Sequence, residues 1–324
     1  MLDLADISNL DEAFARFKVD YLDSLRHLSR FAARRDSQAL VATAMARGRL
    51  DLPLGSDPES GNVVALTYVP PGNFQMGHTE KQRLAGNRAS SASHFDFSTP
   101  SHSIQITSGY FIGIYEIPHF QFQSFLDATG TKLRVDTISV TSSEVDRIKP
   151  ITNVTWENAV AFCDWLSELH QLPVRLPTEV EWEYAARGDH FVQQYEGDLE
   201  SDALMGGPWP VNHESLDRQW RGTIGMRGNV QEWCLDRWNE RAYEDRVVRT
   251  SDGKRGSFPY SPSAQMVDDH PGPHVVRGAS YRDARANKDA ALRRYKAEQS
   301  SNDTVGFRIV VPVPLSEDTK GAQR

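Results

Sequence analysis

Few residues of this chain have the type and spacing that redox or metal chemistry requires. Only two cysteines occur among 324 residues, Cys163 and Cys234, too few for a four-cysteine zinc site or a disulfide framework. Cys163 shares a helical stripe with Trp156 and Leu166, which predicts a small buried hydrophobe and not a nucleophile. Cys234 directly follows Trp233, and we expect it to be buried as well. The sequence therefore indicates no reactive thiolate.

Two histidines that flank a Pro-Gly-Pro sequence form a second candidate for chemistry. His270 directly follows Asp268 and Asp269, and His274 comes after the Pro-Gly-Pro sequence. Imidazole and carboxylate ligands would suit iron, zinc or copper. However, a Pro-Gly-Pro loop with two histidines is more often a rigid turn, because such short motifs also match by chance. We therefore expect an exposed turn, with a metal site as the alternative.

The charge and hydropathy of the chain exclude several classes of partner. Its formal net charge is -8 and its pI is near 5.7, whereas a nucleic-acid-binding face needs clustered basic residues. No apolar run approaches the ~18 residues of a membrane span. The first residues are acidic, unlike the basic start of a secretory leader. We therefore expect a cytoplasmic protein that binds neither nucleic acid nor membrane.

The N-terminal residues differ in texture from the rest. Apolar side chains at spacings of three and four over 8–35 predict an amphipathic helix, and a second helix is expected over 37–47. We expect these helices to pack on the main domain, and a homodimer through them is the alternative. Residues 50–62 hold two prolines, two glycines and two serines, which is typical of a linker. The predicted parts are a helical extension (1–49), a linker (50–62), the main domain (63–313) and a tail (314–324).

The main domain begins with short strands and irregular segments. Residues 63–69 read as a β-branched strand, and apolar residues alternate over 103–115. Between them, 78–101 lacks any apolar periodicity and is predicted to be a polar loop. Pro118 suits the first turn of a helix, where its missing N–H costs nothing, and Phe122 would lie on the buried side of that helix.

Two helices in the middle of the chain have clear start signals. Thr155 is a suitable N-cap for a helix over 155–170. Thr178 and Glu181 form a T-x-x-E capping box, which predicts a helix over 178–187. Beyond these helices the chain is irregular, and long irregular stretches inside a domain usually carry function or are held by side-chain networks.

Several segments together form an ordered set of motifs. They are VPPGNFQMG at 69–77, PITNVTWENAVAFCDWL at 150–166, RLPTEVEWEYAARG at 175–188, GNVQEW at 228–233, VVRGASYRD at 275–283 and VGFRIV at 305–310. This set resembles the formylglycine-generating enzyme, or sulfatase-modifying factor, family over roughly residues 63–313. The resemblance implies an α+β, C-type-lectin-like fold that is loop-rich, with a small antiparallel sheet and two main helices, here with an N-terminal helical extension.

The redox metals that the resemblance implies do not suit the residues present. In copper-dependent members two cysteines near the C-terminus bind the metal, but Asp283 stands at the first position and the second falls near Lys288. Neither side chain can replace a thiolate as a ligand of a soft cuprous ion. Iron-dependent members take histidines from an additional helical domain, whereas His27 is the single histidine among the first 77 residues. Sulfatase activation through copper is therefore excluded.

Calcium is the metal that the resemblance leaves open. Its ligands would be the carbonyl oxygens of Gly228 and Val230 and the side chain of Glu232, since hard oxygen donors suit calcium. The asparagine that serves as a family ligand is replaced here by Gly225. The alternative is that internal hydrogen bonds hold Glu232.

The resemblance also locates a candidate ligand cleft. Its residues would be Trp238, Ser280, Tyr281, Asp283 and Arg294. Asp283 is the candidate general base, and Tyr281 or Arg294 would hold a polar substrate. The alternative is that Ser280 and Tyr281 belong to a turn that the fold needs in any case.

Two functions remain compatible with the sequence. Cysteine-less relatives are associated with oxidative maturation of natural products, so the resemblance favours an oxidoreductase-like enzyme or accessory protein that tailors a small secondary metabolite such as a toxin or siderophore. The redox cofactor is not indicated. The alternative is a non-catalytic module that binds a ligand or a protein on the lectin-like scaffold. Diversified receptors of this fold carry many asparagines in a variable stretch, but 282–304 holds only Asn287 and Asn302.

Overall fold

The computed structural model describes most of the chain, in two units. The described residues are 37–55, 62–89, 93–131, 143–188, 206–252, 255–264, 272–284 and 287–313. Met1–Ala46 and Arg47–Arg324 form separate compact units. Residues 37–47 are helical, as predicted, whereas the amphipathic helix expected over 8–35 lies outside the described residues. No helix in the described part of the chain is long and apolar enough to cross a membrane.

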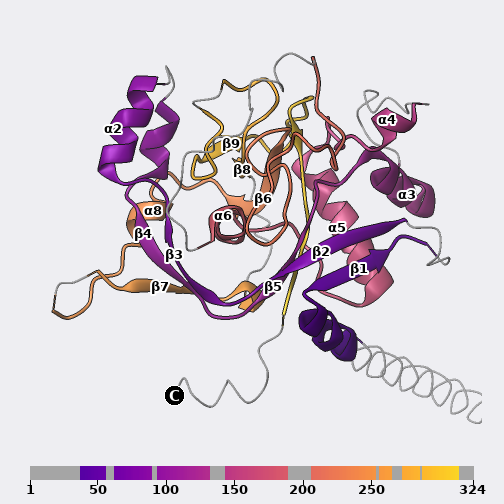
Figure 1. The fold of residues 1–324 in the computed structure, drawn as a ribbon, viewed down its shortest axis with the longest axis horizontal. Coiled ribbons are helices and arrows are strands. Elements are labelled where there is room, and N and C mark those ends of the chain that lie inside the picture. Colours follow the sequence, from indigo (N-terminus) through magenta and orange to yellow (C-terminus); the bar gives the residue numbers. More distant parts are fainter. Residues whose placement is uncertain are drawn as a thin grey trace, which may run out of the picture. The chain divides into compact units, whose positions relative to one another are not determined.

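The larger unit is built on small sheets that join distant segments (Figure 1). The first sheet is antiparallel, in the order β1 (Arg49–Pro53), β2 (Val63–Val69), β5 (Tyr110–Gly113) and β11 (Val310–Pro312). The second pairs β3 (Gly72–Met76) antiparallel with β4 (His102–Ile106), and β4 parallel with β7 (Ser257–Tyr260). The third has the order β10 (Val305–Gly306), β6 (Gln231–Arg237), β8 (His274–Arg277) and β9 (Arg294–Lys296).

Along the chain, helices alternate with these strands. They are α2 (Glu80–Ala89), α3 (His119–Thr129), α4 (Glu144–Arg147), α5 (Trp156–His170), α6 (Glu179–Arg187) and α8 (Ala242–Asp245), with the 3-10 helices η2 (Ser93–Ser98) and η3 (Pro262–Ala264). Both predicted N-caps are present, each within a capping box: Thr155 caps α5 reciprocally with Asn158, and Thr178 caps α6 reciprocally with Glu181. The two main helices therefore begin where the sequence predicted.

Two predictions about irregular segments are wrong in part. Residues 50–53 were assigned to the linker, but they belong to β1, because Leu50 and Leu52 alternate with polar neighbours and bury their side chains fully. The loop expected over 78–101 contains α2 and η2. Its local signal is a T-x-x-Q capping box, in which Thr79 and Gln82 exchange backbone-to-side-chain hydrogen bonds.

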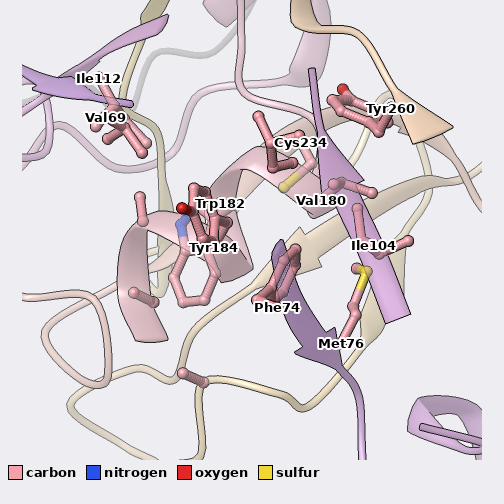
Figure 2. Close-up of a cluster of buried hydrophobic side chains, with 14 of the residues drawn as sticks. Val69, Phe74, Met76, Ile104, Ile112, Val180, Trp182, Tyr184, Cys234 and Tyr260 are labelled. Carbon is pink, nitrogen blue, oxygen red and sulfur yellow. The ribbon is translucent and has the colours of Figure 1, made fainter. Parts of the chain in front are cut away.

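Helix α6 lies inside the core, and each of its residues is buried. Figure 2 shows Val180, Trp182 and Tyr184 in one apolar cluster with Phe74 and Ile104. The ring centroids of Phe74 and Tyr184 lie 5.0 Å apart. Strands β3 and β4 thus pack against a helix that has no solvent-facing side.

The glutamates of α6 are buried as well, and each is paired with an arginine from outside the helix. The pairs are Glu179 with Arg293, Glu181 with Arg175 and Glu183 with Arg277. Arg277 is fully buried and also donates to the Tyr243 hydroxyl and the Ala290 carbonyl. A buried carboxylate without its cation is costly, so these pairs determine which segments meet at α6.

We predict that Arg277→Met destabilises the protein by about 3–5 kcal/mol, because it leaves Glu183 with Arg187 as its remaining cationic partner and removes the buried bonds to Tyr243 and Ala290. The control is Arg241→Met, since Arg241 and Glu244 form a pair whose side chains are 75% and 61% exposed. The control should cost less than about 1 kcal/mol. Urea unfolding followed by tryptophan fluorescence measures both, and equal losses would contradict the prediction.

Candidate functional site

The candidate site is built on the turn that follows β8. Gly278 has a φ of 76°, and a Cβ there would lie 3.1 Å from the Met226 carbonyl oxygen, so the turn requires glycine. The backbone N–H and the hydroxyl of Ser280 both donate to Oδ2 of Asp283, each at 2.7 Å. The turn therefore holds the Asp283 carboxylate in a defined position.

Arg294 of β9 completes this arrangement. Its guanidinium donates to the carbonyl oxygens of Gly278 at 2.6 Å and Asn287 at 3.1 Å. The same group lies 3.6 Å from Oδ1 of Asp283. Burial lowers the pKa of Arg294, and Asp283 opposes that shift. The structure thus brings Ser280, Asp283 and Arg294 together, as the resemblance implied.

The side chains of the other two predicted cleft residues make different contacts. The Tyr281 hydroxyl donates to Asp303 and accepts from Arg282, both at 3.0 Å. The Trp238 ring packs on Tyr295 with a centroid distance of 4.7 Å. Because successive residues of a strand point to opposite faces, Tyr295 and the adjacent Arg294 lie on different sides of β9. Trp238 is therefore separated from the Asp283 turn by the sheet.

Two residues that the sequence reasoning missed lie beside Asp283. The side-chain amide of Gln231 donates to Oδ2 of Asp283 at 3.4 Å. The side-chain oxygen Oε1 of Gln231 is buried and has no hydrogen-bond partner in the described part of the chain. Lys296 lies two positions after Arg294 and hence on the same face of β9. Burial lowers the pKa of Lys296, which Asp283 opposes and Arg294 reinforces. The available signal was strand alternation from Arg294 to Lys296.

Both cysteines are confirmed as buried core residues. Cys163 and Cys234 are free and buried. Burial raises the pKa of each thiol well above its usual range, so neither is a ready thiolate. Asp283 and Lys288, the residues that the resemblance places at copper-ligand positions, offer no soft ligand. The donor set does not fit copper.

The prediction of an exposed turn at His274 is wrong. His274 belongs to β8, is fully buried and stacks on Trp156 with centroids 3.8 Å apart. Stacking in the core outweighs the local Pro-Gly-Pro signal. His270, Asp268 and Asp269 lie outside the described residues. Within the described ranges, no group of three or more His, Cys, Asp or Glu could hold a metal ion.

The predicted calcium ligands include a carboxylate that is already paired with an arginine. Glu232 is fully buried and accepts from Nε and a terminal nitrogen of Arg308 at 2.6 and 2.7 Å. Trp182 donates to it at 2.8 Å. Gly228 and Val230 are buried beside it. Both oxygens of Glu232 are therefore occupied, so the residues fit calcium poorly, and the calcium site stays a prediction of the resemblance.

Comparison with known protein families decides the assignment. Residues 54–313 match the sulfatase-modifying factor enzyme 1-like domain. The chain belongs to this family. The formylglycine-generating enzyme of Streptomyces coelicolor is 31% identical over 192 residues, which are 52% of this chain and 54% of that enzyme.

Other similarities bear on architecture. The structure of PvdO from Pseudomonas aeruginosa superposes with a TM-score of 0.61 over 81% of this chain and 97% of PvdO, at 18% identity. This confirms the predicted α+β, C-type-lectin-like family fold. The serine/threonine-protein kinase Pkn1 of Chlamydia trachomatis is 26% identical over 76% of this chain but only 38% of the kinase. The matched region thus spans about two fifths of the length of this kinase and of the pkn1 kinase of Chlamydia pneumoniae.

We predict that His274 makes the protein sensitive to acid. Burial, reinforced by Arg237, lowers the pKa of His274 from 6.5 to about 4, so protonation favours the unfolded chain. Stability associated with His274 is present above pH 6.5 and is lost as the pH falls toward 4. His274→Phe, which keeps the stacking, should reduce the slope of Tm against pH in this window.

His213→Phe is the matched control, since His213 is half-buried and stacks on Trp209 with centroids 3.9 Å apart. It controls for the loss of a stacked imidazole that is not fully buried. Identical slopes for His274→Phe and the unmodified chain would show that another group is responsible.

Proposed function

We propose that this chain is an enzyme or accessory protein for the oxidative tailoring of a small secondary metabolite, such as a toxin or siderophore, and not a sulfatase activator. One observation carries the proposal: Asp283, which the resemblance places at a copper-ligand position, is bonded to Ser280 and lies adjacent to Arg294. The two cysteines of the chain are buried elsewhere.

The proposed site acts through charge and hydrogen bonds. Oδ2 of Asp283 accepts from Ser280 and Gln231, so Oδ1 is the oxygen available to move a proton. Arg294 and Lys296 place two positive charges on one face of β9. A substrate with an anionic or strongly polar group fits this face. The Tyr281 hydroxyl is bonded to Asp303 and has a structural part in this scheme. The oxidant must come from a separate cofactor or partner.

A non-catalytic binding module is the second candidate, and one comparison favours it. The kinase Pkn1 contains a region similar to this chain as a minority of its length, as expected of a module attached to a different activity. On that proposal the polar turn would recognise a ligand or a protein without transforming it.

The proposal extends to the location of the chain and to its partners. The chain would act in the cytoplasm without binding nucleic acid, in keeping with its net charge of -8. A homodimer through the N-terminal helices is compatible with either function. Sedimentation of the full chain at several concentrations measures the oligomeric state directly.

We predict that the protein does not activate sulfatases. Co-expression with a sulfatase should leave the target cysteine unconverted, and plasma mass spectrometry of the purified chain should find far less than stoichiometric copper, before and after a chelator. The physical reason is the lack of an accessible thiolate. Formylglycine in the sulfatase, or one bound copper per chain, would contradict the prediction.

We predict that Asp283→Asn abolishes product formation without unfolding the protein. The measurement is complementation of a deletion strain, with metabolite extracts compared by mass spectrometry. The deletion should accumulate a precursor that differs from the product by two hydrogens or one oxygen. Asp245→Asn, a change in an exposed aspartate, should restore the product. If folded Asp283→Asn restores the product as well, the role proposed for Asp283 is wrong.

A further inference from the structure

The loop 224–232, to which the resemblance assigns calcium, is held by three polar side chains from different parts of the unit. They are Glu116, which follows β5, Asn229 within the loop, and Arg308, which follows β10. We propose that these side chains replace a metal ion as the fastener of this loop, and that the loop in turn holds the turn of the candidate site. This inference does not depend on the proposed function.

Arg308 occupies the place of the cation. Its guanidinium is fully buried and binds both oxygens of Glu232. The same group donates to the carbonyl oxygens of Gly113 at 2.9 Å and Ile224 at 3.0 Å. It thus ties the loop to β5 as a coordinated ion would. A divalent cation at Glu232 would have to displace a buried positive charge, and the two would repel each other.

Glu116 fills the space of the missing side chain. Its side chain is fully buried, and its Oε1 accepts from the Asn229 amide at 3.1 Å. A Cβ on Gly225 would lie 2.9 and 3.1 Å from the two oxygens of this carboxylate. A side chain at position 225 and the Glu116 carboxylate therefore compete for the same space. This accounts for the glycine that departs from the family pattern.

Asn229 connects the loop to the candidate site. It has a φ of 61°, a left-handed conformation that asparagine tolerates better than most residues. Its side-chain oxygen accepts from the Trp209 backbone N–H at 2.8 Å, and its backbone carbonyl accepts from the Tyr281 N–H at 2.7 Å. One residue thus joins Glu116, the segment at Trp209 and the turn that carries Asp283.

The first test is thermal unfolding of the full chain with calcium chloride and with a calcium chelator. We expect the same Tm in both. A calcium site filled at about a hundredfold excess over its Kd would raise Tm by several degrees. A rise of that size, lost in Glu232→Gln, would overturn the proposal.

The second test separates the fastener from general stability. Asn229→Ala keeps the carbonyl that accepts from Tyr281 but removes the side-chain bonds to Trp209 and Glu116 that hold this carbonyl in place. It should therefore speed amide hydrogen exchange of the segment around Tyr281 about tenfold. Asn158→Ala, which removes the capping partner of Thr155 in α5, should leave that segment unchanged. Equal exchange in the two variants would refute the connection to the turn.

The third test is a double-mutant cycle. Gly225→Ala should lower Tm strongly in the unmodified chain because its Cβ meets Glu116. In a Glu116→Ala background the same change should lower Tm less, since only the backbone strain at a φ of 75° remains. Additive losses would show that position 225 and Glu116 do not compete for one space.

Discussion

The pairing of buried carboxylates with guanidinium groups around α6 is the constraint on which the rest of the larger unit depends. A helix whose glutamates are all shielded from water cannot persist unless each charge is compensated, because desolvation costs several kcal/mol per ion. Glu179, Glu181 and Glu183 meet this condition through Arg293, Arg175 and Arg277. Arg175 lies shortly before α6, Arg277 ends β8, and Arg293 directly precedes β9. These ion pairs hold together segments that share few backbone hydrogen bonds with α6.

This charge pairing also positions the candidate site. Arg293 points into the core toward Glu179, and Arg294, the next residue, reaches the Gly278 turn and Asp283. Arg293 therefore anchors the start of β9 in the core, and Arg294 contacts the turn of the candidate site. On the other side of the turn, the Tyr281 N–H is held by Asn229. The turn is thus fixed from two directions, and neither contact requires a metal.

The family assignment establishes a fold and leaves the chemistry to the residues of the turn. In this chain the turn is a closed set of hydrogen bonds among Ser280, Gln231 and Asp283, with Arg294 adjacent. Such a set suits recognition or proton movement better than electron transfer, because it contains no soft ligand. Any oxidation would need a separate cofactor to accept the electrons. The two positive side chains, Arg294 and Lys296, are the part of the site that could select a ligand.

The sequence by itself determined the features that depend on neighbours three or four residues apart. The caps at Thr155 and Thr178, the burial of Cys163 and the ordered motifs of the family were all readable, and the T-x-x-Q signal at Thr79 was readable although it was missed. Only the tertiary structure decided that His274 is buried against Trp156, that Trp238 packs on Tyr295, and that Arg308 pairs with Glu232. Local hydrogen bonds are encoded within one turn of chain. The partner of a buried charge or ring is chosen by packing between segments far apart in the sequence, and no local pattern specifies it.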